Sequence, residues 1–307
     1  MRTTIRSASE IERKYLLNLD PVYHYTSPDS MIQILEKRQL WFTRFDCLND
    51  AGEGKYIQSV FSKVIQRFRE EGGTDESFLN EIEGIIPNYH FYFRILDNTL
   101  KEYEDDEVSY AEDKKSKPYL CCFSKKNDLL PMWNYYSKNN RFEGYNLGFS
   151  FNEMVRNHEN IDLFQIVYDE NDQISIIKDD IEIVYENYTV NHHGIDTCKQ
   201  RLNSILSRRS MQFKDKAFKN EEEVRLVYWE PEDDNNLVID SKPIKYRSKC
   251  GIVIPYIEVE FERKQIESLM IGPLIQTEIA EKTVKELLKS NDYSDVKVEH
   301  SRIPIRY

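Results

Sequence analysis

Strand-like and helix-like segments alternate irregularly along this chain, and that irregularity is the strongest constraint on its fold. β-type runs such as "VYHYT" (22–26), "PYLCCFS" (118–124) and "GYNLGFSF" (144–151) are separated by helical stretches of very different length. A doubly wound parallel sheet requires a regular strand–helix–strand repeat, which this sequence does not show. We therefore predict an α+β fold: a single mixed domain over residues 1–307 with a helical insertion at about 55–115.

Local signals indicate where several elements begin and end. Ser27 before Pro28 is typical of a helix N-cap followed by proline at the first helical position. Gly72 and Gly73 predict the end of a helix that begins near residue 54. The remaining predictions are a long helical stretch at about 174–217, a helix capped by Thr277, and strands at 162–170, 221–230, 250–261, 266–273 and 296–307.

Composition limits the classes of protein that the chain can belong to. Its 307 residues include 40% hydrophobic and 12% aromatic residues, which predicts a folded chain with a substantial core. The net charge of −12 argues against a surface that grips nucleic acid as a whole, although the basic stretch 199–219 remains a local candidate. The five cysteines show no spacing suited to zinc, so we expect reduced thiols and no metal. Without a signal peptide or a long apolar run, we expect a cytoplasmic protein with no membrane partner.

Polar residues in strand-like segments are the candidates for chemistry. His24 interrupts an aromatic strand, where it is either a satisfied core histidine or a ligand-binding one. In "EEEVRLVYW", alternate residues of an extended strand share a face, so Glu221, Glu223 and Arg225 are expected to line up. These charges form either an edge-strand ion ladder or the polar stripe of a site.

Several longer motifs occur in a characteristic order along nearly the whole chain. They are "YHYTS", "LWFTRFDCLND..E", "CFSKKNDLLPMWNYYS", "GYNLGF", "F..E.E.RL" (Phe218, Glu221, Glu223, Arg225, Leu226), "MIGP" and "SRIPIRY". Together they resemble a bacterial family known as domain of unknown function 2971. That resemblance implies no biochemical activity.

A second resemblance implies one. A strand that carries a histidine, an aromatic residue and a threonine before a helix is similar to the opening of ADP-ribosyltransferase folds, here His24, Tyr25 and Thr26. Such folds have a split β-sheet core, a tyrosine in the middle of the domain and a glutamate on a late strand. The resemblance implies Tyr135 or Tyr136 for the tyrosine and Glu223 for the glutamate. It also implies NAD as the substrate, an acceptor that is protein or nucleic acid, and a toxin or phage-defence role with a neutralising partner protein.

The chemistry of NAD cleavage explains why these residue types are suited to it. Breaking the nicotinamide–ribose bond develops positive charge on the sugar, as in glycoside hydrolysis. A carboxylate beside the ribose stabilises that charge and accepts a proton, with Glu223 the candidate and Glu221 nearly equal to it. His24 would orient the ribose, and Trp133, Tyr135 or Tyr136 would stack on nicotinamide. The candidates for pairing with the pyrophosphate are Arg44, Arg225 and Arg302.

Two other functions remain open at the level of sequence. One is a non-catalytic module that binds a nucleotide or a partner in the same cleft. The other is a metal-dependent nuclease that uses five residues: His24, Asp50, Glu53, Glu221 and Glu223. Nicotinamide release without added metal, a ligand-dependent melting temperature without turnover, and inhibition by a chelator distinguish the three.

Overall fold

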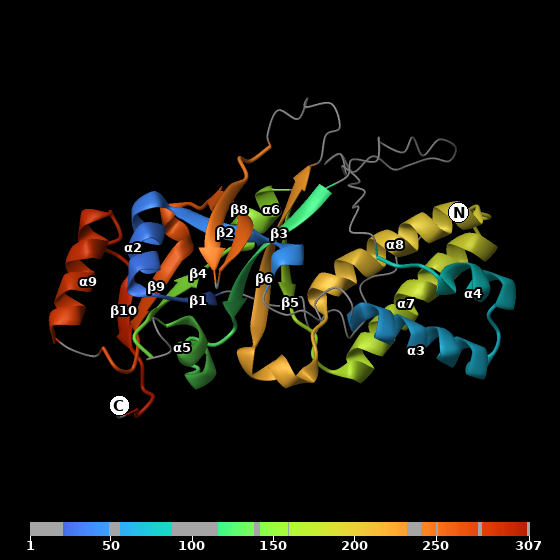
Figure 1. The fold of residues 1–307 in the computed structure, drawn as a ribbon, viewed down its shortest axis with the longest axis horizontal. Coiled ribbons are helices and arrows are strands. Elements are labelled where there is room, and N and C mark those ends of the chain that lie inside the picture. The colour runs from blue at the N-terminus through green and yellow to red at the C-terminus, as the bar shows by residue number, and fades with distance from the viewer. Residues whose placement is uncertain are drawn as a thin grey trace.

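The computed structural model describes residues 21–48, 56–87, 116–137, 142–158, 160–231, 241–249, 251–275 and 278–305. Within these ranges, one open sheet of ten strands is combined with helices (Figure 1), which confirms the predicted mixture of strands and helices. The strands are β1 (Val22–Thr26), β2 (Gln39–Arg44), β3 (Ser116–Ser124), β4 (Tyr145–Phe149), β5 (Ile161–Gln165), β6 (Glu223–Pro231), β7 (Lys245–Lys249), β8 (Ile252–Glu260), β9 (Ile266–Ile271) and β10 (Lys297–His300). Neighbouring strands of this sheet pair in antiparallel fashion, except β9 with β10, which are parallel.

The helices follow the local signals of the sequence. They are α2 (Pro28–Lys37), α3 (Tyr56–Glu71), α4 (Glu76–Glu83), α5 (Leu130–Tyr136), α6 (Asn152–Asn157), α7 (Glu170–Thr189), α8 (Ile195–Gln212) and α9 (Glu278–Ser290). Ser27 caps α2 by accepting a hydrogen bond from the Ser30 backbone N–H. Gly72 and Gly73 end α3 with φ angles of 70° and 90°, a left-handed conformation that glycine adopts without strain. None of the helices in the described ranges is long and apolar enough to cross a membrane.

Strand β3 is the centre of the sheet. Along its full length one edge pairs with β6, from Ser116 opposite Pro231 to Ser124 opposite Glu223. The other edge is shared: β2 pairs near Tyr119 and Leu120, whereas β1 pairs at Ser124. From there β1 continues into β4, β9 and β10, and β2 continues into β8 and β7. The two groups of strands therefore diverge along one edge of β3.

The two faces of the sheet have different environments. The core face carries the main hydrophobic cluster, in which Leu147, Phe123 and Leu226 pack with apolar residues of α2 and α9. The opposite face, which we call the α5 face, carries smaller clusters around Trp133 and around Val227. Because side chains alternate along a strand, Cys122, Ser124, Glu223 and Arg225 all lie on the α5 face.

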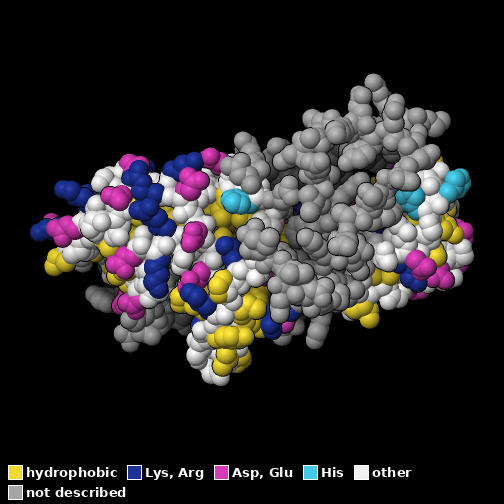
Figure 2. Space-filling view, turned by 90° about the horizontal axis from the view of Figure 1, so that it is seen from above, with side chains coloured by type: hydrophobic (Ala, Val, Ile, Leu, Met, Phe, Trp, Pro, Cys, Tyr) yellow, Lys and Arg dark blue, Asp and Glu magenta, His cyan; other side chains and the backbone are white. Residues whose placement is uncertain are grey.

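A helical bundle beside the sheet is built from two distant segments. Helices α3 and α4 follow β2, and helices α7 and α8 lie between β5 and β6. The four pack through one apolar cluster at the end of the molecule opposite α9 (Figure 1). Part of the predicted insertion at 55–115 thus forms α3 and α4, while 88–115 lies outside the described residues. On the face shown in Figure 2, basic and acidic side chains are interspersed over the end that carries α2 and α9.

Three predicted segments differ from the structure. The strand expected at 162–170 ends at Gln165, and the chain enters α7 at Glu170, after the N-cap Asp169. The helical stretch expected at 174–217 is two helices separated at 190–194, followed by a 3₁₀ helix, η3 (Lys216–Glu221). The closing strand expected at 296–307 is limited to β10, and residues 301–305 are irregular. Thr277 lies outside the described residues.

A substitution at Gly272 provides a test of the packing between β9 and the segment before β4. A Cβ atom at Gly272 would lie 2.5 Å from the Gly144 carbonyl oxygen and 3.0 Å from that of Phe142, both backbone atoms. We predict that Gly272→Ala lowers the free energy of unfolding by about 1–3 kcal/mol, because the backbone has to shift. Gly84→Ala, where nothing lies within 4 Å and φ is −81°, is the matched control with a change below about 1 kcal/mol. Equal effects in urea denaturation would contradict this packing.

Candidate functional site

Four charged side chains meet where η3 leads into β6 on the α5 face. The Glu223 carboxylate pairs with Arg225 through Oε1–Nε at 2.8 Å, and with Lys214 through Oε2–Nζ at 2.9 Å. Lys214 also pairs with Glu221 at 2.7 Å. Arg225 donates a further hydrogen bond to the Met211 carbonyl. We call Lys214, Glu221, Glu223 and Arg225 the ion cluster.

The ion cluster is almost fully buried, and the charges within it determine the pKa values of its members. Burial alone would raise the pKa of Glu223, but Arg225 and Lys214 outweigh it and hold that pKa at about 2. Burial opposes the charge of Lys214, yet the neighbouring glutamates raise its pKa. Glu223 is 4% exposed and Arg225 1% exposed. Glu223 is therefore a permanent anion whose two oxygens are both held by cations.

Glu221 differs from Glu223 in three respects. It ends η3 instead of lying on β6, so the predicted alignment of Glu221 with Glu223 along one strand is wrong. The reason is Glu222, whose left-handed backbone (φ 47°) separates the 3₁₀ helix from the strand. The Glu221 side chain keeps 16% of its surface exposed, and among the described residues only its Oε2 atom has a partner. Burial raises the pKa of Glu221, against the opposing effect of Lys214. Glu221 is thus the carboxylate with an oxygen available to another molecule.

Helix α5 brings an aromatic hydroxyl to the ion cluster. It packs against η3, and it carries Tyr136, which is 38% exposed. Burial of the hydroxyl raises the pKa of Tyr136 well above its usual value, with Cys122, Glu223 and Glu221 adding to the effect. The predicted residues Tyr136, Glu221, Glu223 and Arg225 are therefore brought together.

Sequence reasoning missed the residues that complete this arrangement. Lys214 neutralises both glutamates, and the Cys122 thiol donates a hydrogen bond to Glu223. Ser124 donates to the Glu221 carbonyl, and the Tyr168 hydroxyl accepts from the Glu223 backbone N–H. The sequence carried no specific signal for Lys214, because Lys216 and Lys219 lie nearer to the three glutamates along the chain.

His24 lies on the other face of the sheet. Its ring packs 5.4 Å from that of Phe123 in the main core, and its strand partner is Leu147. Nδ1 is 3.1 Å from the Cys122 carbonyl oxygen, so the neutral ring donates to β3 where β1 has left it. Burial lowers the pKa of His24, the Cys122 carbonyl partly offsets this, and the charge of Arg247 lowers it further. The expected grouping of the His24 imidazole with the Glu223 carboxylate around one ribose is not met, because β3 lies between them.

A second group of predicted residues converges on Asp128. Its carboxylate accepts hydrogen bonds from Trp133 Nε1, from the Ser301 hydroxyl and from the Arg302 backbone N–H, at 2.7–2.8 Å. Trp133 stacks edge-on against Tyr25, whose hydroxyl bonds to the backbone of Lys126 and Leu129. A cavity of about 470 Å³ opens beside this group and is lined by Asn127, Asp128, Met270, Lys297, Glu299, His300 and Arg302.

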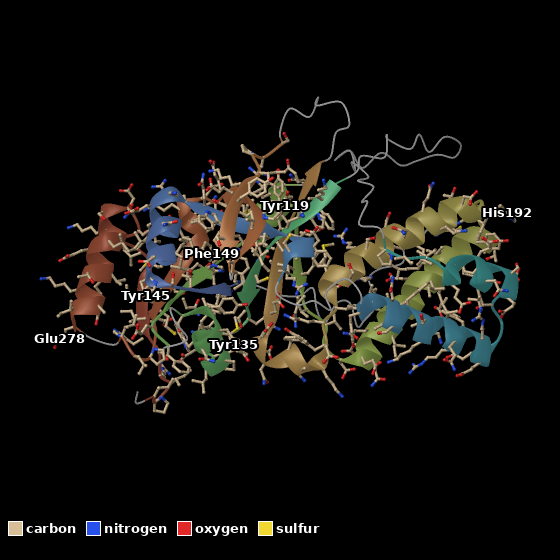
Figure 3. The ribbon with its side chains drawn as sticks, in the orientation of Figure 1. Tyr119, Tyr135, Tyr145, Phe149, His192 and Glu278 are labelled. Atoms are coloured by element: carbon tan, nitrogen blue, oxygen red, sulfur yellow. The ribbon has the colours of Figure 1, made fainter. Side chains whose placement is uncertain are left out.

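The remaining predicted residues lie apart from the ion cluster. Tyr135 is on α5 but 59% exposed (Figure 3). Thr26 is buried opposite Tyr145. Arg44 pairs with Asp46 and lies opposite Tyr119, toward the other end of β3. These three residues do not contribute to the ion cluster.

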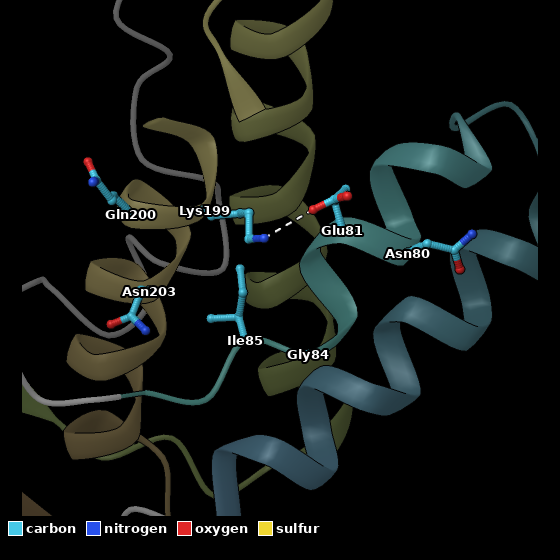
Figure 4. Close-up of a pocket in the computed structure, with 7 residues that line it drawn as sticks. All are labelled: Asn80, Glu81, Gly84, Ile85, Lys199, Gln200 and Asn203. Carbon is cyan, nitrogen blue, oxygen red and sulfur yellow. Dashed lines mark hydrogen bonds and ion pairs between the residues drawn. The ribbon is translucent and has the colours of Figure 1, made fainter. Parts of the chain in front are cut away.

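Most of the basic stretch at 199–219 is committed to internal ion pairs. Lys199 pairs with Glu81, Arg208 with Asp162, and Arg209 with Asp180. Lys199 and Glu81 border a cavity of about 530 Å³ between α4 and α8 (Figure 4). Few cations of this stretch therefore remain available for the nucleic acid that the sequence analysis considered.

The residues expected for a metal-dependent nuclease are only partly described. Asp50 and Glu53 lie outside the described residues. Within the described ranges, no group of three or more His, Cys, Asp or Glu side chains is arranged to hold a metal ion.

Fold and ion cluster together define a mixed α/β protein with a charged site at the start of a central strand. Residues 132–226 match the model of the family described as "Protein of unknown function (DUF2971)", so this segment of the chain is similar to that family. The matched segment contains Tyr136 and the whole ion cluster. No curated protein and no solved structure matches the chain.

The ion cluster predicts a specific dependence of stability on pH. The pKa of Glu223 is lower in the folded chain (about 2) than its ordinary value of 4.5. Its stabilisation, about 3 kcal/mol, is therefore complete above pH 4.5 and is lost as the pH falls toward 2. We expect Glu223→Gln to destabilise the chain by about 3 kcal/mol at pH 7, because it leaves two cations uncompensated, and by progressively less below pH 4.5.

Urea denaturation between pH 2.5 and 7 measures this difference. Glu153→Gln is the control, since Glu153 pairs with Lys264 on the surface and 59% of its side chain is exposed. Its effect should stay below about 1 kcal/mol at every pH. A Glu223→Gln effect that is small or independent of pH would mean that the ion cluster is not formed in solution.

Proposed function

We propose that this chain breaks the nicotinamide–ribose bond of NAD, as a mono-ADP-ribosyltransferase or an NAD glycohydrolase. One observation carries the proposal: Tyr136 meets Glu221, Glu223 and Arg225, a segment more than 80 residues further along the chain, on one face of the sheet. The divergence of β1 and β2 along β3 supports it, since the ADP-ribosyltransferase folds that the opening of the sequence resembles have a split sheet.

Glu221 is the reacting carboxylate in this proposal. Its Oε1, which has no partner among the described residues, stabilises the positive charge that develops on the ribose as the C–N bond to nicotinamide breaks. The oxygen of water, or of an acceptor hydroxyl, then forms the new bond to the same carbon, and Glu221 takes its proton. Nicotinamide leaves as a neutral molecule. A raised pKa suits this role, because a carboxylate freed from full ionic pairing is the better base.

Glu223 has a positioning role in the same scheme. Both of its oxygens are held by Arg225 and Lys214, so it fixes the lysine that in turn orients Glu221. Tyr136 supplies a partly exposed ring beside Glu221 on which nicotinamide can stack. Arg225 is committed to Glu223, and among the predicted arginines only Arg302 keeps a guanidinium without a described partner for the pyrophosphate.

The complete pairing of the Glu223 carboxylate favours a second candidate function. A glutamate whose two oxygens are fully paired and whose pKa is about 2 is typical of a structural ion network. On that basis the chain would bind a nucleotide or a partner on the α5 face without turning it over. The two functions differ in whether NAD is consumed.

Nicotinamide release from NAD, measured by chromatography without added metal, tests the proposal. We expect turnover by the wild type and a loss of at least about 100-fold in Glu221→Gln, which removes the base. Glu222→Gln is the matched control, because the adjacent carboxamide leaves the ion cluster intact, and it should retain activity.

The outcomes separate the candidates. Labelled ADP-ribose that remains on a protein or nucleic acid indicates transfer, and free ADP-ribose indicates hydrolysis. A rise in melting temperature with NAD but no release in any condition favours the binding module. Release that Glu221→Gln does not change would remove Glu221 from the mechanism, and release that a chelator abolishes would indicate metal-dependent chemistry.

A further inference from the structure

Arg247 is a guanidinium in a half-buried position without a counter-ion. It lies on β7, opposite Ile254 of β8, and its Nη2 donates a 2.7 Å hydrogen bond to the Thr43 hydroxyl. In the part of the chain that the structure describes, no carboxylate pairs with it, and its Nε is buried without a hydrogen-bond partner. Buried arginines are normally paired, so this one lacks an anion.

Two aromatic rings hold the Arg247 side chain in place. The guanidinium carbon lies 5.7 Å from the Trp41 ring centroid and 5.9 Å from that of Tyr256, on the neighbouring strands β2 and β8. The two rings are themselves 4.5 Å apart. Cation–π contact fixes the plane of the guanidinium and lowers the entropy that a bound anion would otherwise cost. The cation is thus pre-oriented as well as unpaired.

Its free donors match a tetrahedral anion. Nε–H and Nη2 lie on the same edge of the guanidinium, and Nη2 carries a second hydrogen besides the one that it gives to Thr43; this is the two-pronged edge with which arginine binds oxyanions. Thr43, only 7% exposed, uses its oxygen to accept from Arg247, which leaves its own O–H free to donate. Three convergent donors suit a phosphate better than a carboxylate, since a phosphate has three terminal oxygens to accept them.

The position of Arg247 is also informative. Its charge acts on His24 and on Cys121, which line the divergence of β1 and β2 along β3. Arg247 bonds to Thr43, which lies opposite Leu120 in the middle of β3, whereas the ion cluster lies at the Ser124 end of that strand. Burial lowers the pKa of Arg247, consistent with a cation that lacks compensation.

We propose that Arg247, Thr43 and the rings of Trp41 and Tyr256 form a binding site for the phosphate group of a small phosphorylated molecule. The inference goes beyond the proposed NAD cleavage and stands whether or not Glu221 turns NAD over. It assigns a function to Arg247, which lies outside the segment that the family model matches.

The test is thermal unfolding and calorimetry of the full chain with inorganic pyrophosphate. We expect pyrophosphate to raise the melting temperature of the wild type. Arg247→Met should weaken binding at least about tenfold, since it loses charged hydrogen bonds. Lys245→Met is the matched control: it removes one cation from the same strand, where Lys245 pairs with Glu258, and should bind as the wild type does. Arg247→Lys keeps the charge but loses the two-pronged donor geometry of the guanidinium, so its affinity for pyrophosphate should be intermediate.

Stability without ligand gives an independent readout. Arg247→Met keeps the contact with the two rings and removes an uncompensated charge, so its melting temperature should equal or exceed that of the wild type. In the wild type, pyrophosphate should shift the ring resonances of His24 and leave those of His192, at the far end of the helical bundle, in place (Figure 3).

Three results would overturn the proposal. They are no effect of millimolar pyrophosphate on the wild type, unchanged binding by Arg247→Met, or a large loss of stability in Arg247→Met without ligand. AMP binding more tightly than inorganic phosphate would identify a nucleotide as the source of the group, and equal binding would identify free phosphate. Either result supports the site. Nicotinamide release is measured separately, so failure of the NAD chemistry does not affect this outcome.

Discussion

The hydrogen-bonding capacity of β3 is the constraint on which the rest of the structure depends. One edge of the strand is fully used by β6, so both remaining groups of strands compete for the other edge. The N–H and C=O groups that point to one edge can each pair with only one neighbouring strand, and β1 and β2 therefore occupy different parts of it. Between them the Cys122 carbonyl accepts from the His24 imidazole. A buried histidine thus satisfies backbone that neither strand reaches.

The pairing of β3 with β6 also positions the charged side chains of the ion cluster. Cys122 and Ser124 of β3 lie opposite Arg225 and Glu223 of β6, and the buried Glu223 carboxylate is stabilised by two cations and a thiol. Such a cluster is costly to assemble and more costly to break, because removing one partner leaves buried charge behind. Glu221 lies at its edge, and within the described residues only one of its two oxygens has a partner; in the proposed mechanism this separates the reacting carboxylate from the positioning one.

Local patterns predicted much of this arrangement and failed where partners are distant. Alternation in "EVRLVYW" correctly placed Glu223 and Arg225 on the face opposite Val224 and Leu226, because the period of a strand is local. The same logic failed for Glu221, since nothing in three successive glutamates reveals the left-handed turn at Glu222. The sequence identified His24 as a candidate but could not show on which face of the sheet its side chain lies. That depends on its contact with β3, about a hundred residues away. The role inferred for Arg247 rests on the fact that no carboxylate of the described residues pairs with it, which only three-dimensional contacts reveal.

The central claim is that the α5 face, with Glu221 and Tyr136, is the side on which NAD reacts, while His24 belongs to the core. A crystal structure with a non-cleavable NAD analogue tests this most directly. The account predicts that the nicotinamide riboside lies against the Tyr136 ring, with the anomeric carbon facing Glu221 Oε1 and His24 still bonded to the Cys122 carbonyl. A ribose held by the His24 imidazole, or an analogue bound only in the Asp128 cavity, would contradict it.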